Sequence, residues 1–321
     1  MIHPIDRLAG LALSRGPSHL KFFSQGWGEQ ALIDPSETFA SEPVPIEIDW
    51  LSRSETSTGR IVGHGTFVSP APHLPHRSKV ANVLSISPAS PTDRVVVLMP
   101  AWNEHDPKVR VAMAKLLADK GVRSLILENP FYGTRHPDPD GGQPITTVSD
   151  FMVMGGAAVS EARGILAAEF AKGLSIGVSG YSMGGNTAAI VSATLDVPVA
   201  TAPLAASHSP GPVFLDGVLN RGIDWKALGG REQEQRLRDT LTGISVLDLD
   251  PKPHHAHAII VRAASDGYIP ASATQELVDH WPGSELRALR GGHASLVWFR
   301  KDQLTDAIVD SFDRMPRTSF P

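Results

Sequence analysis

The chain has 321 residues, no cysteine and a formal net charge of −5, and 41% of its residues are hydrophobic. The lack of cysteine excludes thiolate nucleophiles, CxxC redox pairs and thiolate-bound zinc or iron–sulfur clusters. The composition of 29 basic and 34 acidic residues is not that of a nucleic-acid-binding protein. A chain of this length can bury a core without a disulfide or a metal ion.

The N-terminal segment 1–23 is expected to form a helix that packs on the body of the protein. Its longest apolar stretch, Leu8–Leu13, is too short for a signal sequence or a membrane span. We therefore expect a cytoplasmic protein without an integral membrane segment. A transient contact of Leu20–Phe23 with a membrane surface is the alternative that the sequence leaves open.

The N-terminal third is expected to contain short antiparallel strands between proline-rich loops. Residues 46–50 alternate apolar and polar side chains, as a half-buried strand does, and residues 59–68 are expected to pair with them. Residues 43–45 and 70–91 are interpreted as loops because prolines punctuate them.

From residue 94 onward, buried apolar runs alternate with helical patterns, which is typical of βαβ units. A helix is expected to start at Asp106-Pro107, and another at Thr147, with Asp150 in the capping-box position, to end at Lys172-Gly173. The apolar runs are residues 95–99, 124–127, 176–178, 197–202, 258–261 and 285–289. This rhythm predicts a doubly wound, mostly parallel α/β sheet, with residues 1–321 in a single domain.

Residues 207–255 interrupt the alternation because they contain no convincing strand. Helical patterns cover residues 213–219 and 231–241. An excursion between consecutive strands often covers the carboxyl edge of such a sheet, where ligands bind. We interpret it as a cap or lid; a peripheral packing element is the alternative.

The pattern G-x-S-x-G occurs twice. In residues 173–177 the serine lies where a helix ends and a strand begins, which would not expose it at the sheet edge. In residues 180–184 the serine, Ser182, follows a strand and precedes a helix, which is the arrangement of a nucleophile elbow. Ser182 is therefore the candidate nucleophile.

A serine nucleophile needs a general base, and the base needs an orienting carboxylate. Asp266 follows the run 258–264 and His293 follows the next strand, so both are expected at the sheet edge that carries Ser182. The chain order Ser, Asp, His is the one used by hydrolases of this architecture. The histidines at 254, 255 and 257 precede their strand and lack the spacing of a helical metal pair, so no metal site and no cofactor are predicted.

An acyl-transfer site also needs donors for the developing oxyanion. The backbone N–H of Met183 is the first candidate. The second is Ala101 or Trp102, because the proline that opens their loop has no N–H. Trp102 and Tyr181 are expected to form the pocket wall. Arg135 is a candidate clamp for an anionic group of the substrate, with a structural role as the alternative.

Longer segments carry a resemblance to a known family. They are residues 22–28 (FFSQGWG), 65–70 (GTFVSP), 127–133 (LENPFYG), 148–156 (VSDFMVMGG) and 180–185 (GYSMGG). From residue 20 to about 300 the chain resembles the abhydrolase domain-containing protein eighteen family of the α/β-hydrolase superfamily. The resemblance implies the α/β-hydrolase fold, with Ser182, Asp266 and His293 at the matching motif positions. The chain departs from the family at residues 101–106, where a glycine-containing stretch that ends in Asp-His is replaced.

These observations predict a serine hydrolase that cleaves an ester, such as a lipid or other acyl ester, through an acyl-enzyme. Ser182 would attack, His293 would transfer the proton, Asp266 would hold the imidazole, and the Met183 N–H would bind the oxyanion. An acyltransferase with the same triad and a non-catalytic binding protein of the same fold are the alternatives. A small-molecule acyl substrate is the expected partner, and the sequence does not predict the acyl chain or the oligomeric state.

Overall fold

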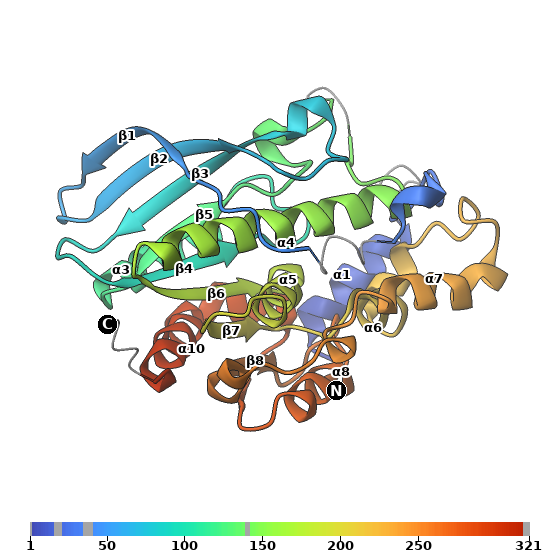
Figure 1. Ribbon diagram of the computed structural model, residues 1–321. Helices are drawn as coiled ribbons and strands as arrows, with labels where there is room; N and C mark the ends of the chain where they lie inside the picture. Colours follow the sequence, from blue (N-terminus) through green and yellow to red (C-terminus); the bar gives the residue numbers. More distant parts are fainter. Residues whose placement is uncertain (1, 16–20, 35–40, 139–141, 317–321) are drawn as a thin grey trace.

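A nine-stranded mixed sheet forms the centre of the protein in a computed structural model that describes residues 2–15, 21–34, 41–138 and 142–316 (Figure 1). The strands are β1 Asp49–Glu55, β2 Ile61–Val68, β3 Val80–Ser87, β4 Arg94–Met99, β5 Arg123–Leu127, β6 Ser175–Tyr181, β7 Ala200–Leu204, β8 Ile259–Ala263 and β9 Glu285–Leu289. Their order is β1-β2-β3-β5-β4-β6-β7-β8-β9. Pairing is antiparallel from β1 to β5 and parallel from β5 to β9, which confirms the mostly parallel sheet with antiparallel N-terminal strands.

Helices cover both faces of this sheet. They are α1 Pro4–Arg15, α3 Lys108–Asp119, α4 Val148–Ala171, α5 Met183–Ala193, α6 Pro210–Leu215, α7 Glu234–Thr242, α8 Ala271–His280, α9 His293–Phe299 and α10 Lys301–Arg314. One apolar cluster joins the sheet to α4, α5 and α8, and a second joins it to α3 and α10. Val95 and Val97 of β4 point into the first cluster and Val96 and Leu98 into the second. A strand buried on both faces has no polar positions, which explains its continuous apolar run.

Helix α4 is the long helix that packs across one face of the sheet. Its start is a capping box: Thr147 Oγ1 accepts the Asp150 N–H at 3.0 Å, and Asp150 Oδ2 accepts the Thr147 N–H at 3.1 Å. Among the described residues it is the one helix long and apolar enough to cross a membrane, but 78% of its apolar window is buried inside the protein. Its apolar composition is accounted for by this burial.

Two expectations for the N-terminal strands are wrong. Residues 46–48 lie outside β1; the Ile46 N–H donates to the Gly164 carbonyl at 3.0 Å, so this segment packs on α4. Its alternation reflects contact with both neighbours, because Ile46 packs on Gly164 of α4 and Ile48 lies against Gly65 of β2. The proline-rich stretch 70–91 contains the whole of β3, in which the buried Ala81 and Val83 alternate with the exposed Val80 and Asn82. The prolines lie outside this strand, where no ladder hydrogen bond is lost.

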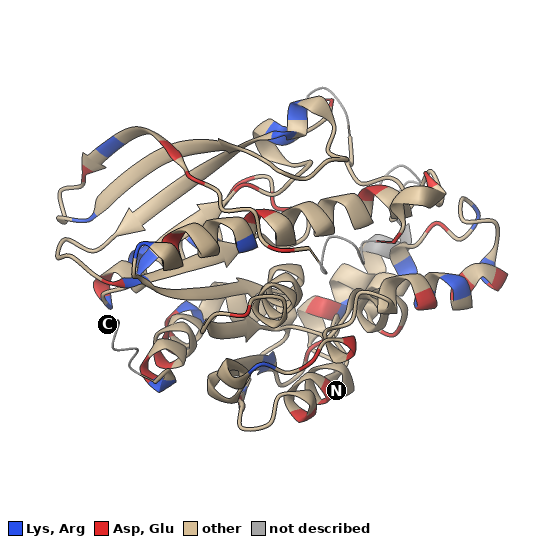
Figure 2. Cartoon of the chain, in the orientation of Figure 1, with Lys and Arg blue, Asp and Glu red and all other residues tan. Residues whose placement is uncertain are grey.

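The part of the β7–β8 connection that holds α6 and α7 lies beyond the carboxyl ends of the parallel strands (Figure 1), and its last residues, from Leu249, return to the opposite edge, where they line a cavity with Ala193 and Asp196. It contains α6, α7 and several short 3₁₀ turns, including Val218–Gly222, and no strand in the part of the chain that the structure describes. Basic and acidic residues are interspersed along α7, as Figure 2 shows. Phe214 and Leu237 of this segment belong to a third apolar cluster, which also holds Phe151 of α4.

Phe22 and Phe23 belong to the same cluster. Phe22 is 5% exposed and Phe23 is fully buried, and their rings lie 5.2 and 5.5 Å from that of Phe214. They are therefore not available for the membrane-surface contact that the sequence left open, and Leu20 lies outside the described residues. Burial of aromatic rings in the core accounts for this hydrophobic segment.

Candidate active site

Ser182 occupies a sharp turn between β6 and α5. Its backbone has φ 59° and ψ −118°, a conformation that costs a non-glycine residue about 1–3 kcal/mol. The turn is held because the Ser182 N–H donates to the Leu204 carbonyl of β7 at 2.8 Å. A Cβ on Gly184 would lie 2.5 Å from the Met99 carbonyl oxygen, so only glycine allows α5 to start this close to β4. This is the nucleophile elbow that the sequence predicts.

The side chains of Ser182, His293 and Asp266 form one continuous hydrogen-bonded array. His293 Nε2 lies 2.8 Å from Ser182 Oγ, and His293 Nδ1 lies 2.8 Å from Asp266 Oδ2. The other carboxylate oxygen, Asp266 Oδ1, accepts the N–H groups of Tyr268 and Ile269 at 2.8 and 2.9 Å. With its proton on Nδ1, the imidazole donates to Asp266 and can accept the serine proton on Nε2. The structure thus brings the three predicted residues together.

Two tyrosines contact His293, one through its ring and one through its backbone. The Tyr268 ring stacks on His293 with the centroids 4.7 Å apart. The Tyr181 hydroxyl donates to the His293 carbonyl oxygen. Burial raises the pKa of Tyr181 well above its usual value, and the negative charges of Asp266 and Asp6 add to this, so the hydroxyl stays protonated and remains a donor. Tyr181 does not line the cavity at Ser182 but lines a neighbouring cavity with Trp102 and Ala101, so its role as a pocket wall stays a prediction.

Ser182 opens into a small, mainly apolar cavity of about 40 Å³. Trp102 and Met183 line it at the nucleophile, as predicted for Trp102. The other lining residues are Phe151, Asn186, Ser207, Ser209, Pro210, Val213, Phe214, Leu219 and Ile269. Because a water molecule needs about 10–15 Å³ of such space, this cavity holds only a few atoms.

The predicted oxyanion donors come from two elements, the start of α5 and the loop after β4. Met183 is the first residue of α5, so its N–H has no acceptor within the helix and lies at the positive end of the helix dipole. Trp102 lines the cavity of Ser182, whereas Ala101 lines a neighbouring cavity together with Tyr181. Of the two residues of the loop after β4, Trp102 is therefore the one that shares a cavity with the nucleophile.

Arg135 is not a substrate clamp. Its side chain is fully buried, and its guanidinium binds both carboxylate oxygens of Glu161 in α4, at 2.9 and 2.6 Å. Its Nε–H donates to the Ser78 carbonyl at 2.8 Å. This pair joins the loop after β5 to the middle of α4, and Arg135 does not line the cavity at Ser182. The structural alternative is therefore the correct one.

We expect Arg135→Met to lower the free energy of unfolding by about 3–5 kcal/mol, because it leaves the Glu161 carboxylate buried without its counter-charge. The double variant Arg135→Met/Glu161→Leu should recover most of this loss, since it removes both charges. Urea unfolding of the wild type and both variants measures the effect. Equal losses in the single and double variants would show that the two side chains do not act as a pair.

The histidine cluster before β8 lies at the edge opposite to Ser182. The His255 ring stacks on Trp281 with the centroids 4.0 Å apart, and His254 Nε2 lies 3.1 Å from the Ser192 carbonyl. Burial lowers the pKa of His254 to about 4 and that of His255 to about 3, so both are neutral parts of the core. Within the described ranges, no group of three His, Cys, Asp or Glu side chains is placed to hold a metal ion.

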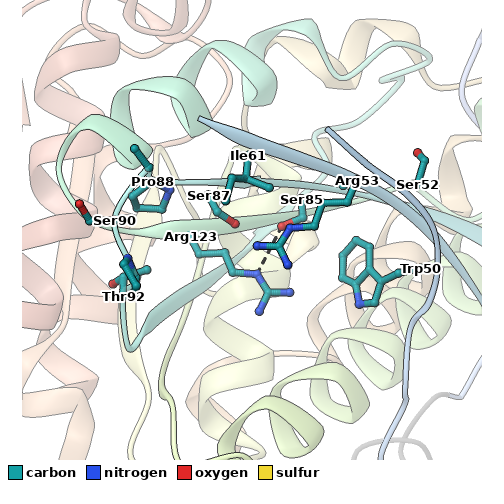
Figure 3. A pocket seen from close by; sticks show the side chains of 13 residues that line it. Trp50, Ser52, Arg53, Ile61, Ser85, Ser87, Pro88, Ser90, Thr92 and Arg123 are labelled. Atoms are coloured by element: carbon teal, nitrogen blue, oxygen red, sulfur yellow. Dashed lines mark hydrogen bonds between the residues drawn. The ribbon is translucent and has the colours of Figure 1, made fainter. Parts of the chain in front are cut away.

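A larger cavity of about 530 Å³ lies away from the triad and is lined by residues of β1, β2 and β3, the loop between β3 and β4, and the start of β5 (Figure 3). Trp50, Arg53 and Arg123 line it together with several serines. The guanidinium of Arg123 is already paired with Glu169 at 3.0 Å and bonded to Ser85. The cavity that adjoins the nucleophile is therefore a separate and smaller one.

Comparison with known proteins identifies the family. A family model described as "Alpha/beta hydrolase domain containing 18" matches residues 20–258 and 245–314. The chain belongs to this family. Within the alpha/beta hydrolases it is similar in fold to the acetyl xylan esterase from Paenibacillus sp. R4, with 14% identity over 93% of this chain and 98% of that chain and a TM-score of 0.57. It is also similar to the S-formylglutathione hydrolase from Agrobacterium tumefaciens, with 12% identity over 84% and 100% of the two chains and a TM-score of 0.53.

Two residues beside His293 were not found from the sequence. Tyr268 lies two positions after Asp266, and its Asp-Gly-Tyr context only indicated a turn. Asp6 accepts the His293 N–H at 2.8 Å from 287 positions away. The one signal for Asp6 is an acidic residue within the largely apolar segment 2–13, which is unusual for a buried helix face.

Proposed function

We propose that the protein is a serine esterase that works through an acyl-enzyme. The observation that carries the proposal is the array of Ser182, His293 and Asp266, with both connecting distances at 2.8 Å, at a strained turn beside an apolar cavity. A serine that acts as a nucleophile needs a base to take its proton and an acid to orient that base, and this array supplies both.

The reaction follows from the proton positions. His293 Nε2 takes the proton as Ser182 Oγ attacks the ester carbonyl, and Asp266 stabilises the imidazolium that forms. The N–H of Met183, with that of Trp102 or Ala101, binds the negative oxygen of the tetrahedral intermediate. When the intermediate collapses, His293 returns the proton to the leaving alcohol. A water molecule, activated by the same base, then attacks the acyl-enzyme and releases the acid.

The cavity supports a short acyl group as the substrate moiety. Its walls are mainly apolar and aromatic, which suits an acyl chain, but about 40 Å³ holds little more than an acetyl or propionyl group. Pro210, Val213, Phe214 and Leu219 of the β7–β8 segment line one side of it. We therefore propose that the segment predicted at residues 207–255 acts as the cap of a single domain through its first part, up to the end of α7, and limits the length of the acyl chain.

A series of p-nitrophenyl esters with acyl chains from two to twelve carbons tests this proposal. We expect kcat/KM to be highest for the shortest acyl groups, because longer chains clash with the cap. Phe214→Ala should move the optimum to longer chains by opening the cavity, whereas Trp298→Ala, at an exposed aromatic residue outside it, should not. A wild-type preference for long chains would contradict the short-acyl assignment.

A further inference from the structure

Helix α1 brings a second buried carboxylate to the triad. The side chain of Asp6 is fully buried. Its Oδ2 accepts the N–H of Gly267, the residue after Asp266, at 3.0 Å and the N–H of His293 at 2.8 Å. Its Oδ1 accepts the Ala294 N–H at 3.3 Å. One carboxylate thus bonds both the loop that carries the acid and the loop that carries the base.

The two loops are shaped to receive this helix. A Cβ on Gly267 would lie 2.8 Å from the Asp6 Cβ, and a Cβ on Gly292 would lie 2.3 Å from the His3 Cβ. Gly267 follows the acid and Gly292 precedes the base, so each loop has a glycine at the point where α1 makes contact. The His3 N–H also donates to the Ser265 carbonyl at 3.0 Å. Helix α1 is therefore fitted between the strand ends of β8 and β9.

The carboxyl-terminal half of α1 contacts the segment between β7 and β8. Gly10 of α1 packs on Val218, where a Cβ on Gly10 would lie 3.0 Å from the Val218 Cβ. The Val218 N–H donates to the Gly267 carbonyl at 2.9 Å. The next residue, Leu219, lines the cavity at Ser182. Helix α1 thus contacts both triad loops and also Val218, which is next to a residue that lines the cavity at Ser182.

The chemistry of Asp6 suits an acceptor of backbone N–H groups. A carboxylate offers two oxygens and bonds to it are about twice as strong as those between neutral groups. Among the ion pairs of the described residues, none includes Asp6, and its carboxylate accepts three backbone N–H groups instead. The negative charge of Asp6 also adds to the burial that raises the pKa of Tyr268, the residue stacked on His293.

We propose that Asp6 is a positioning residue for the triad, and that α1 is a clasp that fixes Asp266 and His293 relative to each other. The proposal rests on the proposed esterase function of the same site. Without the Asp6 carboxylate the two loops lose their shared anchor, and the His293 Nδ1 and Asp266 Oδ2 atoms are no longer held at 2.8 Å.

The experiment compares four full-length proteins: wild type, Asp6→Ala, Asp6→Asn, and Arg7→Ala as an exposed control on the same helix. Turnover of p-nitrophenyl acetate, thermal unfolding, and the low-field proton resonance of the His293 Nδ1–H are measured for each. For Asp6→Ala we expect kcat to fall on the order of 10²-fold, with KM nearly unchanged and the resonance lost. The reason is that a displacement of a catalytic group by about 1 Å can lower the rate by this factor. Asp6→Asn should be intermediate, since its amide oxygen can still accept the two shorter bonds.

A second comparison separates positioning from stability. In a His293→Ala background, Asp6→Ala should not lower the residual rate further, because the base that it positions is absent. An equal loss in both backgrounds, or wild-type kcat and resonance in Asp6→Ala, would overturn the proposal. If the wild type is active and one of these two results is found, the positioning role of Asp6 is rejected and the esterase function is not. A wild type that neither turns over esters nor reacts at Ser182 rejects the esterase function, and the resonance still tests the positioning.

Discussion

Replacing Ser182 with alanine is expected to lower kcat about 10⁶-fold while leaving the protein folded. The variant loses the atom that bonds to the acyl carbon, so His293 and the oxyanion donors have no nucleophile to serve. Relief of the strained turn does not occur, because alanine still carries a Cβ. Initial rates on p-nitrophenyl acetate and labelling with a fluorophosphonate probe measure the loss.

The chain offers a matched control for this variant. Ser175 is the serine of the other G-x-S-x-G match and lies at the start of β6, at the opposite end of the strand from Ser182. Ser175→Ala should keep turnover and labelling at wild-type levels. Unchanged turnover in a folded Ser182→Ala protein would reject the acyl-enzyme mechanism, and labelling at another residue would move the active site.

For Asp266→Asn we expect kcat to fall about 10⁴-fold, the loss typical of this change in a serine triad. The asparagine oxygen can still accept the Tyr268 and Ile269 N–H groups, so the loop keeps its shape. Its NH₂ group then faces His293 Nδ1 and favours the tautomer with the proton on Nε2. That tautomer cannot accept the proton of Ser182.

The thermal unfolding of Asp266→Asn should resemble that of the wild type, and Asp302→Asn, at an exposed aspartate of α10, controls for a general effect of charge removal. A loss of less than tenfold in kcat would show that the orientation of His293 does not depend on the carboxylate. Another group would then have to hold the imidazole.

The triad could be located from the sequence because parallel strands end at the same edge. Ser182 follows β6, Asp266 lies soon after β8, and His293 lies soon after β9, so strand order alone predicts that these residues converge. The mostly parallel sheet was predictable for a similar reason, since a strand buried on both faces leaves an uninterrupted apolar run.

Other features depend on partners that no local pattern reveals. The sequence around Arg135 does not indicate its role, because its partner Glu161 lies 26 residues later within an apolar helix. Asp6 meets His293 only after the whole fold has formed. The antiparallel strand β3 was missed because neighbouring prolines outweighed a short alternation of buried and exposed residues.

The strained turn at Ser182 affects which residue selection for stability would favour at this position. A glycine at this position would adopt the same φ of 59° without steric cost, so the fold by itself favours a residue that has no hydroxyl. Laboratory evolution of this protein for heat resistance alone would therefore favour Ser182→Gly, which removes the nucleophile. Serine can be retained at this position only under a screen that also rewards turnover.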